Sequence, residues 1–185
     1  IAAVSGEVDI EDLIPEEECV FTLTHAGYIK RMATSEYQSQ KRGGRGVTGL
    51  SHKEEDFVEE LFVASSHDHI LFITDIGRAF RLKGYQVATG SRAAKGTNIV
   101  NLLQLQTDEK VTNMLRVPKD REDGFVTMVT KNGLIKRSPL SAYRNIRKSG
   151  LIAIRLDDGD ALAWTRITSG QTELLVATHG GRAIR

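Results

Sequence analysis

The residues most suited to chemistry lie in one short stretch, Gln40-Lys41-Arg42-Gly43-Gly44-Arg45-Gly46. It combines three cations with three glycines and holds neither an acid nor an apolar side chain, so we expect a loop rather than the interior of a strand. Glycine lets the backbone come close to a partner, and guanidinium and ammonium groups bind phosphate oxygens well. The stretch therefore predicts a loop that binds a polyanion.

An internal repeat supplies the elements that must position this loop. A threonine, two further residues, a glycine and a nearby basic residue recur four times, with the glycines at Gly27, Gly77, Gly133 and Gly181. An apolar run precedes each copy, which is typical of a hairpin of two short strands around a glycine turn. Asn132-Gly133 predicts a type I′ turn, which needs positive φ at both central residues.

A second glycine follows each of the first three hairpins, at Gly46, Gly96 and Gly150, and another apolar strand comes after it. Repeats of about 50 residues with several short strands are typical of propeller blades. We therefore predict an all-β fold with about four blades in one domain, residues 1–185; a closed disc and an open or incomplete one are both compatible with the sequence. The predicted units are 18–67, 68–122, 123–171 and a partial 172–185, and residues 1–17, with Val8 and Ile10 in alternation, are expected to add an opening or closing strand.

The net charge of +1 hides a strongly uneven distribution. The three segments that run from a hairpin glycine to the second glycine carry five cations each, and Glu36 is the one acid among them, whereas carboxylates gather in 7–18 and 54–60. Equivalent positions of successive blades lie at equivalent radii, so these cations are expected to form a stripe along one edge that suits the phosphates of double-stranded DNA, with little sequence preference. Besides the loop 40–46, the predicted DNA-binding residues are Lys30, Arg31, Arg78, Arg81, Arg92, Lys95, Lys136, Arg137, Arg144, Arg147 and Lys148.

The loop 40–46 resembles the seven-residue box of the carboxy-terminal domain of the DNA gyrase A subunit, in which the order is Gln, basic, Arg, Gly, Gly, basic, Gly; all seven positions match. Residues 6–14 and 24–31 are similar to that family's opening into its first blade. The resemblance implies a β-pinwheel whose blades exchange strands and which wraps DNA. The resemblance assigns DNA binding to the residues of the box only. The cations of the later blades are predicted from their equivalent positions in the repeat.

The same resemblance implies the setting in which the domain works. The chain begins at Ile1, and we expect it to be a piece of a longer protein. The implied partners are the remainder of the gyrase A subunit and the gyrase B subunit in an A2B2 holoenzyme, which performs ATP-dependent negative supercoiling. ATP and Mg²⁺ belong to other parts of that enzyme, and no cofactor is expected in this fragment. The implied location is the bacterial cytoplasm, in association with the nucleoid.

Two alternatives stay open beside this interpretation. The corresponding domain of the topoisomerase IV A subunit is similar, but its box is degraded or missing. A propeller scaffold that binds acidic protein partners would use the same basic stripe. A salt titration separates DNA from a protein partner, because each neutralised phosphate contributes about −0.9 to the slope of log affinity against log salt.

Catalytic and metal chemistry find no support in the sequence. The family's DNA-cleaving tyrosine lies in an upstream domain, and no tyrosine here matches its context, so this fragment is expected to be non-catalytic by itself. The G-x-G-x-x-G pattern at 44–49 lacks the strand before it that a dinucleotide site needs. His67 and His69 offer two metal ligands at most. No apolar run approaches the length of a membrane span.

Overall fold

Short strands and 3₁₀ helices make up the part of the chain that the structure describes. This is a computed structural model, and it describes residues 10–36 and 56–185. In those ranges there is no α-helix, and the all-β prediction is confirmed. The strands are β1 (Glu18–Thr24), β2 (Tyr28–Ala33), β3 (Val58–Ser65), β4 (His69–Thr74), β5 (Arg78–Lys83), β6 (Thr97–Asn98), β7 (Val111–Val117), β8 (Phe125–Thr130), β9 (Ile135–Pro139), β10 (Leu151–Ile152), β11 (Leu162–Thr168), β12 (Val176–Ala177) and β13 (Ala183–Ile184). The 3₁₀ helices are η1 (Ile10–Leu13), η2 (Thr34–Glu36), η3 (Gly84–Gln86), η4 (Ile99–Asn101) and η5 (Leu140–Tyr143).

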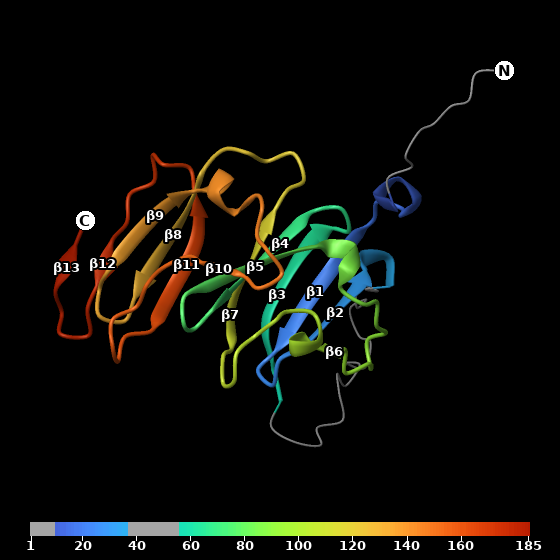
Figure 1. Ribbon diagram of the computed structural model, residues 1–185, viewed down its shortest axis with the longest axis horizontal. Coiled ribbons are helices and arrows are strands. Elements are labelled where there is room, and N and C mark those ends of the chain that lie inside the picture. The colour runs from blue at the N-terminus through green and yellow to red at the C-terminus, as the bar shows by residue number, and fades with distance from the viewer. Residues whose placement is uncertain (1–9, 37–55) are drawn as a thin grey trace, which may run out of the picture.

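The strands form antiparallel sheets that follow one another along the chain as blades. Blade 1 has the strand order β3-β1-β2-β6, blade 2 has the order β10-β5-β4-β7, and blade 3 has the order β11-β8-β9. β12 and β13 pair in a separate hairpin. Figure 1 shows the blades side by side, with η1 and blade 1 at one end of the molecule and β13 at the other. The described residues thus form a row of three blades and a hairpin that repeats their first two strands.

The blades exchange strands. β6 belongs to the second predicted unit, yet it pairs with β2 of blade 1, with Thr97 opposite Ile29. β10 belongs to the third unit and pairs with β5 of blade 2, with Leu151 opposite Ala79. A side chain at Gly96, just before β6, would place its Cβ 2.5 Å from the carbonyl oxygen of Ile29, so this close approach requires glycine. The outermost strand of a blade therefore comes from the following unit, and the sheet boundaries differ from the predicted unit boundaries.

All four hairpins use the same turn. In each, the glycine N–H donates to the carbonyl of the threonine three residues earlier, and the next N–H donates to that threonine's Oγ1. The glycines have φ between 77° and 89°. Asp108 is the one described non-glycine residue with positive φ, so Asn132 does not adopt the conformation of a type I′ turn and that prediction is wrong. The pattern is that of a three-residue hairpin loop closed by a left-handed glycine, with the threonine side chain completing it.

The apolar core lies between the blades. One cluster joins blades 1 and 2 and includes Phe21 and Phe72; a second joins blades 2 and 3 and includes Leu71, Ile73 and Val126. Successive residues of β4 therefore point alternately toward blade 1 and toward blade 3, as the period of a strand requires. Blade 2 buries both faces against its neighbours, and blades 1 and 3 each pack one face against it, so a single blade could not bury its apolar residues alone.

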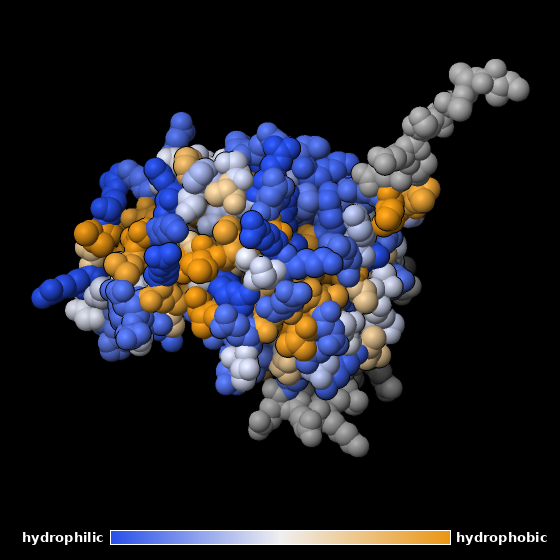
Figure 2. All heavy atoms as spheres, viewed as in Figure 1, coloured by the Kyte–Doolittle hydropathy of each residue, from blue (hydrophilic) through white to orange (hydrophobic). Residues whose placement is uncertain are grey.

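Blade 3 differs from blades 1 and 2 at its outer edge. Among the described residues, no strand pairs with the outer side of β9. Large apolar side chains are exposed on β9, β10 and β13, among them Ile135, Ile152 and Ile184. Figure 2 shows apolar side chains at the surface over β10 to β13.

The segment before β1 is fastened to blades 1 and 2 rather than added as a strand. Ile10 lies in η1, so the expected strand does not extend to it; residues 1–9 lie outside the described ranges. The His67 ring nitrogen Nε2 lies 2.8 Å from the carbonyl oxygen of Ile14, and Lys83 pairs with Glu11 at 2.9 Å. The segment is thus held against the first two blades by polar contacts.

Candidate nucleic-acid interface

Two described connections carry the exposed cations. Residues 87–96 lead from η3 to β6, and residues 144–150 lead from η5 to β10. Both connections run to the outermost strand of the preceding blade, so they lie at its outer side. The predicted cations that they expose are Arg92, Lys95, Arg144, Arg147 and Lys148. The predicted loop 40–46, which has the same place in the first unit, lies outside the described residues.

Lys30 lies beneath the first of these connections and holds it. Its ammonium group donates to the carbonyl oxygens of Ser91, Arg92 and Ala94 at 3.1, 2.9 and 2.8 Å. Lys30 is only 8% exposed, and burial lowers the pKa of its side chain. Three acceptors satisfy all three of its donors. The Lys30 charge is thus used inside the molecule, where it positions the loop that carries Arg92, and a contact of Lys30 with DNA stays a prediction.

Arg31 and Arg81 hold one position of two successive hairpins, and each reaches into the following unit. Arg31 Nε donates to the carbonyl of Val87, just after η3, at 2.8 Å. Arg81 Nη1 donates to the carbonyl of Tyr143, at the end of η5, at 3.1 Å, and also to that of Arg144. These arginines link neighbouring blades. Both lie between the blades, where they hold the backbone of the following unit, and Arg81 also lines a pocket between blades 2 and 3.

Arg78 forms a buried ion pair. Its guanidinium Nη1 lies 2.5 Å from Glu109 Oε2, and the two side chains are 13% and 0% exposed. Arg78 Nη2 also donates to the carbonyl of Ser149, in the second basic connection. Burying a carboxylate without a counter-charge is strongly unfavourable, so this pair is a structural requirement of blade 2. The Arg78 charge is used in this pair, and a contact of Arg78 with DNA stays a prediction.

The corresponding cations of blade 3 are exposed. Lys136 Nζ donates to the carbonyl of Ala153 at 2.6 Å, and Arg137 lies over the ring of Phe125 at 4.6 Å from its centre. Both residues remain accessible to solvent. They stay candidates for phosphate contacts.

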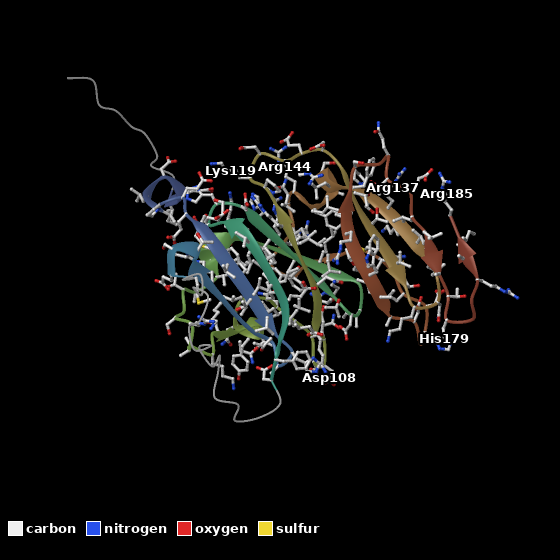
Figure 3. The ribbon with its side chains drawn as sticks, turned by 180° about the vertical axis from the view of Figure 1, so that it is seen from behind. Asp108, Lys119, Arg137, Arg144, His179 and Arg185 are labelled. Carbon is white, nitrogen blue, oxygen red and sulfur yellow. The ribbon has the colours of Figure 1, made fainter. Side chains whose placement is uncertain are left out.

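Several exposed cations share one edge of the molecule. Figure 3 shows Lys119, Arg137, Arg144 and Arg185 along one edge, which we call the basic edge, and Asp108 at the opposite one. Lys119 was not predicted, because it lies in the connection between β7 and β8, outside the segments that run from glycine to glycine. The cation-rich run that contains Lys119 also holds carboxylates, which obscures the signal.

Other kinds of site are not seen in the part of the chain that the structure describes. Within residues 10–36 and 56–185, no group of three or more His, Cys, Asp or Glu side chains is arranged to hold a metal ion. The same ranges contain no helix with the length and apolarity needed to cross a membrane. The exposed cations of the basic connections are therefore the feature from which a function can be argued.

Propeller-like blades that exchange strands and present basic connections on their outer side define the class of this protein. A family model described as the DNA gyrase C-terminal domain, a β-propeller, matches residues 20–65, 68–118 and 125–169. The chain belongs to this family.

Relatives of known identity agree with this assignment. The chain is 51% identical over 185 residues to the DNA gyrase A subunit of Clostridium acetobutylicum, covering 100% of this chain and 22% of that protein. It is 47% identical over 186 residues to the DNA gyrase A subunit of Halalkalibacterium halodurans, covering 99% and 22%. The chain thus spans about a fifth of the length of these relatives.

Solved structures show the same architecture. A structure of the DNA gyrase A C-terminal domain superimposes with a TM-score of 0.63 at 27% identity, covering 83% of this chain and 48% of that one. A crystal structure of the C-terminal domain of DNA topoisomerase IV superimposes with a TM-score of 0.74 at 24% identity, covering 92% and 52%. The second likeness concerns the fold alone.

Proposed function

We propose that this chain binds and wraps double-stranded DNA, largely without sequence specificity, as the carboxy-terminal domain of a DNA gyrase A subunit. The observation that carries the proposal is that the cations have two different roles. Buried cations such as Lys30 hold the connections by their backbone carbonyls, and exposed cations project from those connections. Cations on successive blades suit a ligand that is long and uniformly charged, and duplex DNA carries about one negative charge per 1.7 Å.

Recognition in this arrangement rests on the phosphate backbone. The charged side chains that the two connections expose are all Arg or Lys, which bind phosphate oxygens and fix the position of a duplex without reading its sequence. A duplex that follows several blades must bend, and the ease of bending then decides which sequences bind best. In the whole enzyme, the wrapped DNA would supply the crossing needed for negative supercoiling.

The wider setting is part of the same proposal. The remainder of the A subunit and the B subunit, arranged as A2B2, would provide strand cleavage and the sites for ATP and Mg²⁺, and the enzyme would act in the bacterial cytoplasm on the nucleoid. Membership in the gyrase family supports these partners in place of those of topoisomerase IV. The seven-residue loop 40–46 is proposed as a further DNA contact on the basis of its sequence.

A salt titration with a matched variant tests the proposal. For a duplex of about 40 base pairs, log affinity should fall against log salt with a slope of about −5 or steeper if six or more phosphates are neutralised. The double variant Arg147→Gln, Lys148→Gln should reduce the steepness by about 1.8 and leave the melting temperature unchanged, because both side chains are exposed. Asp108→Asn, on the opposite edge, is the control. A slope near zero, or tighter binding of a polyglutamate peptide than of the duplex, would favour the protein scaffold.

A further inference from the structure

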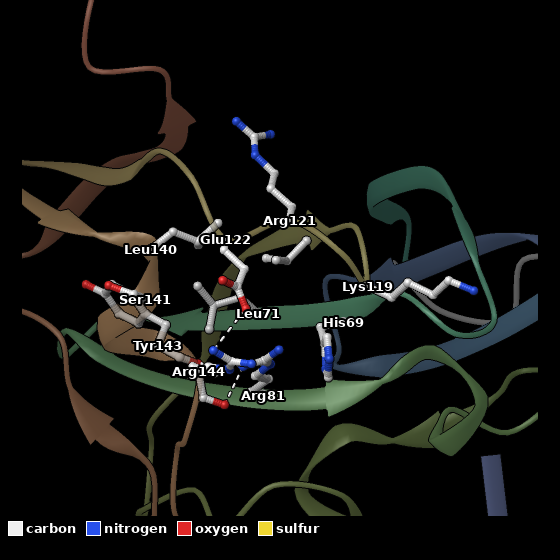
Figure 4. A pocket seen from close by; sticks show the side chains of 11 residues that line it. His69, Leu71, Arg81, Lys119, Arg121, Glu122, Leu140, Ser141, Tyr143 and Arg144 are labelled. Carbon is white, nitrogen blue, oxygen red and sulfur yellow. Dashed lines mark hydrogen bonds and ion pairs between the residues drawn. The ribbon is translucent and has the colours of Figure 1, made fainter.

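A pocket between blade 2 and blade 3 gathers cations from three separate parts of the chain. It has a volume of about 230 Å³ and is lined by His69 of β4, Arg81 of β5, Arg144 after η5, and the residues Lys119, Arg121 and Glu122 of the β7–β8 connection. Figure 4 shows Arg81, Arg144 and His69 close together, while Lys119 and Arg121 extend away from them. Four full cations thus share this pocket with a single carboxylate.

The positive charge at the centre of the pocket is not balanced. Arg81 Nη1 donates to backbone carbonyls, and the buried Nε atom of Arg81 has no hydrogen-bond partner among the described residues. Burial, and then the charge of Arg144, lower the pKa of Arg81. Burial, followed by Arg81 and Lys83, lowers the pKa of His69 to about 4, although Glu11 and Asp68 act in the opposite direction. Arg81 and Arg144 thus bring two guanidinium groups to one pocket, which suits an anion with several oxygens.

Glu122, the carboxylate that lines the pocket, is held by an exposed ion pair. Glu122 Oε1 lies 2.9 Å from Arg144 Nη1, with the two side chains 70% and 66% exposed. Lys119 pairs in the same way with Glu16 at 2.8 Å, with both side chains well exposed. Exposed pairs of this kind contribute little to stability and are screened by salt. A stronger acceptor can therefore replace Glu122 at Arg144 without disturbing the fold.

We propose that this pocket binds a phosphate group, and that Glu122 occupies Arg144 until the phosphate displaces it. Two guanidinium groups from different elements can donate to different oxygens of one tetrahedral anion, which is the arrangement that arginine favours. Arg144 lies on the basic edge beside Lys119, where a duplex is proposed to bind. The source that we favour is a DNA phosphodiester, which rests on the proposed function; a free phosphate has the same chemistry.

The test uses duplex binding by the whole chain and three single variants. Arg144→Gln should weaken binding of a duplex of about 40 base pairs by about tenfold and make the salt slope shallower by about 0.9. Glu122→Gln should tighten binding by about threefold, because the phosphate then has no competitor. Asp108→Asn makes the same change of charge on the opposite edge, and asparagine tolerates its φ of 63°, so binding should stay near that of the original chain. If Glu122→Gln and Asp108→Asn tighten binding equally, the effect comes from net charge alone, and the proposal that phosphate displaces Glu122 is wrong.

The Arg81 Nε–H resonance provides a readout that does not depend on affinity. It should shift when inorganic phosphate or the duplex is added, because an anion bound beside the guanidinium group changes the surroundings of that N–H. A shift with the duplex alone supports a DNA phosphodiester as the source, and a shift with both supports a general phosphate pocket. If the duplex binds and neither probe shifts the resonance, the pocket proposal fails while DNA binding stands. If phosphate shifts it and the duplex does not bind, the pocket stands and the proposed function fails.

Discussion

The outer edges of blade 2 and blade 3 are built from similar hairpins but present different surfaces. At blade 2, β10 from the next unit covers the edge, and Arg78 and Arg81 of the hairpin donate to carbonyls of the connection that leads into it. At blade 3, no described strand covers β9, and Lys136 and Arg137 are exposed. The same position of the repeat thus serves packing in one blade and faces solvent in another.

This comparison explains how a chain of net charge +1 can present a basic surface. Cations under a covered edge are used to hold the backbone of the next unit, and the cations carried by that unit are displaced outward. Each blade therefore orients the charges of its successor. The comparison predicts that inner cations determine stability, whereas outer cations determine affinity for a polyanion.

The largest effect is expected from the buried pair of blade 2. Arg78→Gln leaves the Glu109 carboxylate, which is fully buried, without a counter-charge, and should lower the free energy of unfolding by about 3 kcal/mol. Chemical denaturation measures this loss. Arg182→Gln is the control, because Arg182 has the same position in the last hairpin and is exposed; it should change stability by less than about 0.5 kcal/mol. Equal losses of stability in the two variants would show that the strand covering the edge does not decide how much an arginine at this position contributes to stability.

A smaller effect is expected for the lysine beneath the first basic connection. Lys30→Met leaves three carbonyl oxygens without their donor and should lower the free energy of unfolding by about 2 kcal/mol, with weaker duplex binding because the connection that carries Arg92 is released. Lys136→Met is the matched variant at the exposed edge. It should reduce the steepness of the salt slope by about 0.9 with little loss of stability. The comparison fails if Lys136→Met destabilises the chain as much as Lys30→Met does.

The repeat made much of the fold predictable from sequence. Threonine and glycine at fixed spacing mark the turns because both groups are used there: the glycine takes positive φ, and the threonine Oγ1 accepts an N–H. The alternation of apolar residues in β4 likewise shows that both faces of blade 2 are buried. Asn132-Gly133 was misread as type I′ because local preference does not reveal the three-residue loop that the repeat imposes.

The use of individual cations could not be predicted in the same way. Ile29-Lys30-Arg31 and Ile135-Lys136-Arg137 are identical tripeptides after a glycine turn, yet one lysine is buried and the other exposed. What separates them is β6, a strand of the following unit. It begins 67 residues after Lys30 and reaches β2 only through tertiary pairing. No local pattern encodes that difference. Repeat phase predicts where a side chain lies within its blade, and the neighbouring unit decides whether solvent reaches it.

The smallest effect concerns the pH dependence of stability that comes from His69 in β4 of blade 2. Burial, with Arg81 and Lys83 in support, lowers the pKa of His69 to about 4, so the folded chain keeps this ring neutral while an unfolded chain protonates it near pH 6.5. As the pH falls from about 6.5 toward 4, the unfolded state binds the extra proton and the free energy of unfolding should decline. His69→Gln should flatten this decline in denaturation curves recorded between pH 4 and 7. His179→Gln, in the exposed last hairpin, should leave it unchanged; an identical decline in the His69 variant would assign it to other groups.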